Sequence, residues 1–169
     1  MPDWPEIFDV LKALYGEVER EAKKIADLHA ERLKCERGCC DCCVDNLSVF
    51  EVEAEHIQQS CGDVLVQAAY PEGKCAFLDP EGACRIYAFR PYVCRTQGLP
   101  LRWFDVDEDG EAVELRDICP LNEGGKPVET LASNSCWEVG PFEGRLATLQ
   151  ASVDGGILRR VVLRDLFGA

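Results

Sequence analysis

The sequence predicts a small α+β fold in which a long amino-terminal helix and further helices surround short β-hairpins and a cysteine-rich centre. Three observations predict it. Apolar residues follow a helical period near the amino terminus, short apolar runs are paired around turn sequences, and all of the eleven cysteines except Cys136 fall within about residues 33–124. With 169 residues, 47% of them hydrophobic, the chain is expected to form one domain over residues 1–169.

The first helix is predicted from Asp3 toward Lys34. Asp3 can cap it by accepting a hydrogen bond from an unpaired backbone N–H, and Pro5 suits a first turn. Gly16 can divide the helix into two, because glycine costs about 1 kcal/mol in a helix interior. The apolar residues that recur at intervals of three, four and seven positions are Ile7, Leu11, Leu14, Val18, Ile25 and Leu28.

A cysteine-rich loop and two shorter helices are predicted next. Residues 35–43 hold five cysteines and show no helical period, so we expect a loop. Ser48 and Glu51 have the spacing of a capping box, which predicts a helix over residues 48–59. A shorter helix is expected over residues 63–70.

Two hairpins are predicted from pairs of apolar runs that flank turn sequences. The first joins residues 75–78 to 83–87, with one cysteine on each arm, and the second joins residues 101–106 to 112–116. An acidic run over residues 105–111 lacks the spacing of an EF-hand calcium loop, and we expect it to be a solvated turn.

The remaining segments are expected to be short or to cover the rest of the fold. Residues 90–95 predict a turn or short helix, because Pro91 disfavours helical geometry at Arg90. Residues 141–153 are predicted to be a helix, and residues 157–167 a strand or a helix.

The charge and the absence of apolar runs exclude several classes of partner. A net charge of −13 disfavours nucleic acid and anionic lipid, which require a surplus of lysine and arginine. No stretch approaches the roughly 18 apolar residues that would span a membrane. The first residues have neither the basic region nor the apolar run of a signal peptide, so we expect a soluble cytoplasmic protein.

The cysteines are better explained as metal ligands than as disulfides. Their number is odd, several are adjacent in sequence, and a cytoplasmic protein keeps its thiols reduced. Thiolates select zinc, copper(I) or iron-sulfur clusters, whereas magnesium and calcium prefer oxygen. Cys35, Cys39, Cys42 and Cys43 are spaced closely enough for one turn to fold several sulfurs around a metal. The cysteines that would complete the site from a second segment are Cys75, Cys84, Cys94 and Cys119.

This cysteine pattern resembles the putative zinc- or iron-chelating domain family, also called the CxxCxxCC or YkgJ-like family. The similar parts are the block over residues 35–43, the segment over residues 75–95 and Cys119-Pro120, which together cover about residues 33–124. The resemblance implies a partner that is a metal ion or cluster, with zinc or an iron-sulfur cluster as the cofactor. The ligands that it implies are Cys35, Cys39, Cys42, Cys43, Cys75, Cys84, Cys94 and Cys119.

The sequence departs from the family pattern at two positions. Three residues separate Cys35 from Cys39 where many members have two, and Cys40 replaces a residue that is often glycine. The family also has an Arg-Pro pair before its third downstream cysteine, which Arg90 matches here. Guanidinium groups near a multi-thiolate site would offset its negative charge, so Arg90 and Arg95 are candidates for this role or for an ordinary surface pair.

Five further residues have side chains that can bind metals but fall outside the pattern. Cys61 and Cys136 are expected to be buried as small hydrophobic residues. Cys40 lies inside the loop, and two roles stay open for it, that of a metal ligand and that of a buried small residue. His29 and His56 lie on predicted helices, where a packed or partly exposed histidine is the simpler expectation and a metal ligand the alternative.

Three functions are compatible with these observations. The first is a metal-binding module. The second is metal storage or delivery, in which the metal would exchange readily. The third is an iron-sulfur-dependent redox or group-transfer enzyme. Cys35, Cys39 and Cys42 have the spacing of radical S-adenosylmethionine enzymes, although the chain is too short for their usual barrel. No Ser-His-Asp set, phosphate-binding glycine loop or dinucleotide fingerprint is visible, which disfavours conventional hydrolase and nucleotide chemistry.

Overall fold

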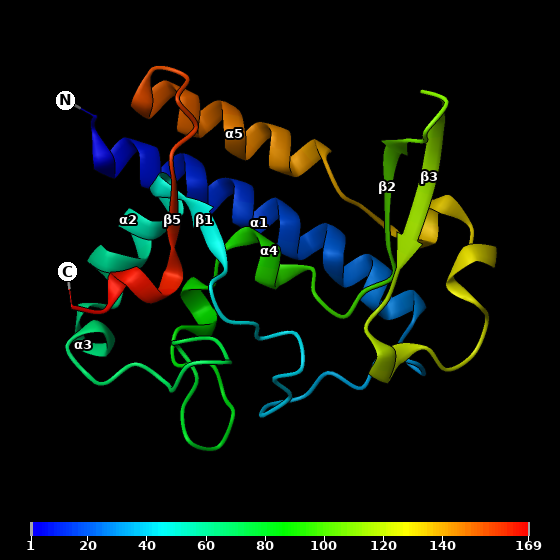
Figure 1. The fold of residues 1–169 in the computed structure, drawn as a ribbon, viewed down its shortest axis with the longest axis horizontal. Helices are drawn as coiled ribbons and strands as arrows, with labels where there is room; N and C mark the ends of the chain where they lie inside the picture. Colours follow the sequence, from blue (N-terminus) through cyan, green and yellow to red (C-terminus); the bar gives the residue numbers. More distant parts are fainter. Residues whose placement is uncertain (1, 169) are drawn as a thin grey trace.

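The computed structural model describes residues 2–168 and has the predicted α+β fold (Figure 1). Its longest element is α1 (Trp4–Leu28), and α5 (Pro141–Asp154) lies along it in the opposite direction, as Figure 1 shows. The other α-helices are α2 (Glu51–Ser60), α3 (Gly62–Leu65) and α4 (Tyr92–Arg95). The 3₁₀ helices are η1 (Tyr87–Phe89), η2 (Pro120–Asn122), η3 (Val128–Thr130), η4 (Ser133–Ser135) and η5 (Leu163–Leu166).

Helix α1 begins where the sequence predicts. The Asp3 carboxylate accepts a hydrogen bond from the Glu6 N–H at 3.4 Å, and proline occupies the first turn. Gly16 does not divide the helix. The predicted end at Lys34 is wrong, because residues after Leu28 form turns that are held by the η2 segment. There Arg32 Nε donates to the Asn122 carbonyl at 2.9 Å.

A two-stranded sheet joins two distant parts of the chain. Strand β1 (Ser48–Phe50) pairs with antiparallel β5 (Arg160–Val162), with Val49 opposite Val161. The prediction that a capping box at Ser48 and Glu51 opens a helix is therefore wrong at its first residues. Residues 157–167, predicted as strand or helix, contain both β5 and η5.

The true start of α2 is capped by segments that are distant in sequence. The Glu51 N–H donates to the Arg159 carbonyl at 3.1 Å, and the Val52 N–H donates to Gln150 Oε1 at 2.9 Å. The Glu53 carboxylate accepts from the Phe50 N–H, which is the reciprocal half of a capping box. Residues from α5 and the carboxyl-terminal segment thus satisfy backbone groups that a local serine was expected to bind.

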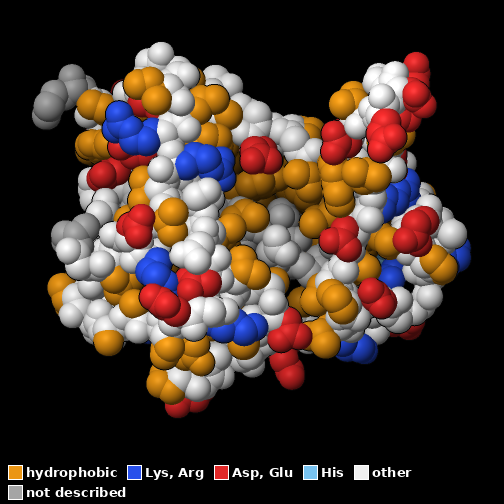
Figure 2. Space-filling view, viewed as in Figure 1, with side chains coloured by type: hydrophobic (Ala, Val, Ile, Leu, Met, Phe, Trp, Pro, Cys, Tyr) orange, Lys and Arg blue, Asp and Glu red, His pale blue; other side chains and the backbone are white. Residues whose placement is uncertain are grey.

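The second sheet contains the hairpin that was predicted over residues 101–116. Strand β2 (Leu101–Val106) pairs with β3 (Ala112–Asp117), and Trp103 lies opposite Leu115. The sequence did not predict β4 (Trp137–Glu138), which pairs in parallel with the start of β2. The hairpin projects from the body of the molecule, and its acidic turn is visible at the tip in Figure 2.

Two other predicted elements are shorter than expected. Residues 63–70 contain only the single turn of α3. Of the first hairpin, the described residues between 75 and 87 contain one isolated bridge, between Leu78 and Cys84. The turn between them is closed by Asp79, whose carboxylate accepts from the N–H groups of Glu81 and Ala83 at 3.0 and 2.8 Å. These bonds add to two backbone bonds that flank the bridge, from the Asp79 N–H to the Ala83 carbonyl at 2.8 Å and from the Arg85 N–H to the Phe77 carbonyl at 2.9 Å, so the predicted hairpin is present in a very short form.

The hydrophobic core has two parts. The first packs α1 against α5 and includes Leu11, Val18 and Leu146, each at most 1% exposed. The second packs buried residues of α2 against Phe77 and Ile86. Among the residues that the structure describes, none of the helices has the length and apolar character needed to cross a bilayer.

Replacing Gln150 with leucine is expected to destabilise the protein by about 1–3 kcal/mol, because the buried Val52 N–H would lose its acceptor. Chemical denaturation of the purified variant measures this change. Ser152→Ala, an exposed substitution on the same helix, is the matched control and should change the free energy of unfolding by about 0.5 kcal/mol or less. Equal effects of the two substitutions would contradict this role for Gln150.

Candidate metal centre

Thiols from three separate segments converge on one region. The first segment is the loop over residues 35–43, the second is the loop over residues 75–84, and the third is α4, which carries Cys94. The first two are joined by a backbone hydrogen bond from the Cys75 N–H to the Cys43 carbonyl at 3.0 Å. This contact places the first downstream cysteine directly beside the cysteine block.

The second loop approaches the first closely because of a glycine. Gly82 has φ +82°, and a Cβ at this position would lie 3.0 Å from the Gly38 carbonyl oxygen. Another residue would therefore be strained in this conformation and would crowd the opposite loop. The same imagined Cβ would lie 3.5 Å from Cys40 Sγ, so Cys40 faces the turn between Cys75 and Cys84.

Five of the predicted ligands are electrostatic neighbours of one another. The Cys43 thiol donates to the Cys42 sulfur, which lowers the pKa of Cys42 to about 6 and raises the pKa of Cys43. Negative charge at Cys75 or Cys94 raises the pKa of Cys43 further. Burial raises the pKa of Cys94 to about 12, and charge at Cys75, Cys84 or Cys42 adds to this. We call Cys42, Cys43, Cys75, Cys84 and Cys94 the thiol cluster.

Two sulfurs of the thiol cluster accept hydrogen bonds from the backbone. The Phe77 N–H donates to the Cys75 sulfur, and the Ile86 N–H donates to the Cys84 sulfur. Both contacts lower the pKa of the thiol and oppose burial, which raises it. Donors that point at a sulfur stabilise its thiolate form, which is the form that binds metal.

Basic side chains border the cluster. The charge of Lys74 lowers the pKa of Cys42, and its Nζ donates to the Cys40 carbonyl at 3.2 Å. Lys74 is not marked by any of the sequence patterns above, although its position beside Cys75 is a possible signal. Arg90 and Arg95 both form ion pairs with Glu19 of α1, at 3.0 and 2.7 Å. Of these two, Arg90 also lowers the pKa of Cys84.

Three predicted ligands lie at the margin of the thiol cluster. Cys39 is an electrostatic neighbour of Cys35 on one side and of Cys42 on the other. Cys35 approaches Gly98 so closely that a Cβ there would lie 2.5 Å from its sulfur. Asn122 holds this margin together, because its Nδ2 donates to Cys35 Sγ at 3.4 Å and its N–H donates to the Cys119 carbonyl at 2.8 Å.

Asn122 is an organising residue that the sequence analysis missed. It is fully buried, and besides Cys35 it binds the Gly98 carbonyl and the Lys34 N–H, each at 2.8 Å. These contacts fix the start of the cysteine block against the 3₁₀ turn that follows Cys119. No pattern in a single sequence marks an asparagine for this role, because its partners are far apart along the chain.

The other candidate residues occupy separate surroundings. Cys61 and Cys136 are buried, at 3% and 4% exposure, as the sequence analysis expected, although Cys61 is an electrostatic neighbour of Cys84. His29 Nε2 contacts the Ser135 carbonyl at 2.7 Å. His56 is buried beside the rings of Phe8, Tyr15 and Phe89, and neither of its ring nitrogens has a hydrogen-bond partner among the described residues.

The thiols suit a thiophilic metal, but in this structure they do not surround a metal position. Within residues 2–168, no three His, Cys, Asp or Glu side chains form a group that could hold a metal ion as they stand. The converging ligands are sulfurs, which zinc and iron-sulfur clusters select. Residues 35–44, which carry five of the cysteines, contain turns but no helix or strand.

Comparison with known proteins gives one match. The family model CxxCxxCC, described as a putative zinc- or iron-chelating domain, matches residues 34–120. These residues make up just over half of the chain and include the whole thiol cluster and its margin. No curated protein and no solved structure matches the chain.

Proposed function

The chain belongs to the putative zinc- or iron-chelating domain family, and on this premise we propose that it binds zinc or an iron-sulfur cluster through cysteine thiolates. The observation that carries the proposal is the convergence of the thiol cluster from three separate segments. Cysteines that served only as buried hydrophobic residues would have no reason to gather in this way. Sulfur ligands favour these cofactors over magnesium or calcium.

Cys75, Cys84 and Cys94 are proposed to form the fixed side of the site. Cys75 and Cys84 accept hydrogen bonds from the backbone of their own loop, and Cys94 lies on α4, which packs against α1. Bound metal would supply a positive charge that keeps these thiolates ionised despite their burial. The described contacts therefore support a preformed half-site.

The loop over residues 35–43 is proposed to supply the adaptable side. Cys42 and Cys43 already lie beside the fixed cysteines, and their thiol–thiol hydrogen bond would be lost when both sulfurs bind metal. Cys35, Cys39 and Cys119 are proposed as further ligands, reached by rearrangement of the loop or used in a second site. In either case metal binding would order a segment that has no regular secondary structure, so binding would also stabilise the fold.

Anaerobic purification followed by visible absorption spectroscopy and elemental analysis tests this proposal. Iron and acid-labile sulfide in equal amounts, with a brown colour, would identify a cluster, whereas a colourless protein with stoichiometric zinc would identify a zinc site. A purified protein with neither metal, and with no uptake of either from solution, would contradict the proposal. Competition with a chelator then separates a delivery protein, which should release metal readily, from a structural site, which should unfold when stripped.

A further inference from the structure

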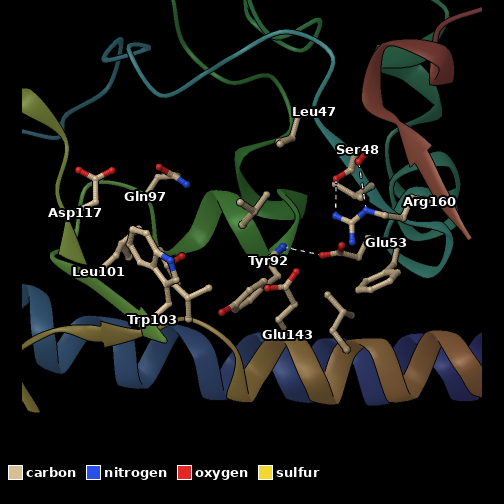
Figure 3. Close-up of a pocket in the computed structure, with 16 residues that line it drawn as sticks. Leu47, Ser48, Glu53, Tyr92, Gln97, Leu101, Trp103, Asp117, Glu143 and Arg160 are labelled. Carbon is tan, nitrogen blue, oxygen red and sulfur yellow. Dashed lines mark hydrogen bonds between the residues drawn. The ribbon is translucent and has the colours of Figure 1, made fainter. Parts of the chain in front are cut away.

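A cavity of about 370 Å³ is lined in part by Tyr92 and Val93 of α4 and by Thr96 and Gln97, which follow this helix. It is bordered by β1 and Arg160 of β5 at one end and by Leu101 and Trp103 of β2 at the other, with α5 below, as Figure 3 shows. Figure 2 shows a hollow on this face, between the projecting hairpin and the rest of the molecule, with hydrophobic side chains along it. The volume suits a small organic molecule.

The charged groups that line the cavity are mostly carboxylates. Glu53, Glu143 and Asp117 line it, and Arg160 is the one basic side chain among its lining residues; Figure 3 shows Asp117 and Arg160 at opposite ends. The Arg160 guanidinium is already engaged, because it donates to Ser48 Oγ and to the Ser48 carbonyl at 3.3 and 2.9 Å and lies over the Phe50 ring. The cavity therefore carries an excess of negative charge.

The three carboxylates differ in how many hydrogen bonds they already accept from the protein. Glu53 accepts hydrogen bonds from the Tyr15 hydroxyl and the Tyr92 N–H at 2.8 and 2.7 Å, so its position is fixed. Asp117 accepts from the Ile118 N–H at 2.8 Å. Glu143, in the first turn of α5, has no hydrogen bond or ion pair with any residue that the structure describes. Glu143 is thus the carboxylate that is free to bind a ligand.

A second polar group in the cavity also lacks a partner. Thr96 is only 4% exposed, yet its hydroxyl makes no hydrogen bond to the described part of the chain. This hydroxyl is not one of the fully enclosed groups that lack a partner among the described residues, so water or a ligand in the cavity can hydrogen-bond to it. Tyr92 and Trp103 also line the cavity, and aromatic rings of these residues attract organic cations.

We propose that this cavity binds a small organic ammonium ion with an apolar body. Glu143 binds the ammonium group, and the Thr96 hydroxyl accepts a hydrogen bond from one of its N–H groups. The apolar body lies against Trp103, Val139 and Leu146, which line the same cavity. Neutral and anionic molecules of the same shape would lose the charge-assisted bond to Glu143 and bind more weakly.

The cavity and the thiol cluster share α4. Cys94 belongs to the cluster, while Tyr92 and Val93 of the same short helix line the cavity. Residues of the two proposed sites are therefore adjacent along this helix. The binding proposed here depends only on groups that line the cavity and does not require the metal.

Isothermal titration calorimetry with three phenethyl compounds tests the proposal. The probes are 2-phenylethylamine, which is protonated at neutral pH, 2-phenylethanol and 3-phenylpropanoate, and the protein is used as purified with its metal content measured on the same sample. Saturable binding of the amine, with much weaker binding of the alcohol and the acid, is the expected result. No saturable binding of the amine, or equal binding of all three compounds, would overturn the proposal.

Two variants locate the binding. Glu143→Gln should weaken amine binding by about tenfold or more, because the charge-assisted hydrogen bond is lost. Glu108→Gln makes the same change of charge on the exposed hairpin turn and should leave binding unchanged. An equal loss in both variants would indicate attraction by the overall charge of −13 and would refute the assigned site. Trp103→Leu should also weaken binding, and it provides an independent test if Glu143→Gln does not fold.

Discussion

A Cys84→Ala variant is expected to lose most of its bound metal and more than about 3 kcal/mol of its free energy of unfolding. Cys84 lies at the closing end of the 75–84 loop, with its sulfur beside Cys75 and Cys94 and within reach of the Ile86 N–H. Removing it would open the fixed side of the proposed site. Elemental analysis and chemical denaturation of the same preparation measure both losses.

Cys136→Ala is the matched control for this experiment. Cys136 is as buried as a core residue, at 4% exposure, but its charged neighbours are Arg116, Arg102 and Glu114 rather than other thiols. This variant should keep its metal and lose about 1 kcal/mol from the smaller buried side chain. Equal metal content in the two variants would exclude Cys84 as a ligand.

The parts of the fold that the sequence predicted well depend on contacts that are local in the chain. Helix α1 carries its own cap at Asp3 and a regular apolar face, and the β2–β3 hairpin carries its own turn. The region around Ser48 was predicted wrongly because its partners are distant. Its strand pairs with residues 160–162, and the helix that follows is capped by Gln150 and Arg159. A local capping pattern cannot show such competition.

The same distinction applies to the candidate site. Short spacings, ligand chemistry and the family resemblance predict eight cysteine ligands, of which Cys42, Cys43, Cys75, Cys84 and Cys94 are electrostatic neighbours in the structure; whether they bind metal stays a prediction. The sequence could not show that Gly82 permits the two loops to meet or that Asn122 holds Cys35. It also could not show the cavity beside α4, because its carboxylates come from α2, β3 and α5.

Phe77→Ala is expected to destabilise the protein by about 3–5 kcal/mol, the usual cost of removing a buried phenylalanine ring. Phe77 is 1% exposed and packs against Phe167, with ring centroids 4.8 Å apart and ring planes tilted by 51°. Chemical denaturation measures the loss. Phe104→Ala is the matched control, because Phe104 is 58% exposed on the hairpin and its removal should cost about 0.5 kcal/mol or less.

The same variant tests whether the second core supports the metal centre. The Phe77 N–H donates to the Cys75 sulfur, and its carbonyl accepts from the Arg85 N–H at 2.9 Å, so the Phe77 backbone spans the loop between Cys75 and Cys84. When the ring no longer fixes this backbone, both sulfurs gain freedom that metal binding must remove. Phe77→Ala should therefore release metal to a competing chelator more readily than Phe104→Ala does. If both variants compete equally with the chelator, the ring stabilises the core without positioning the ligands.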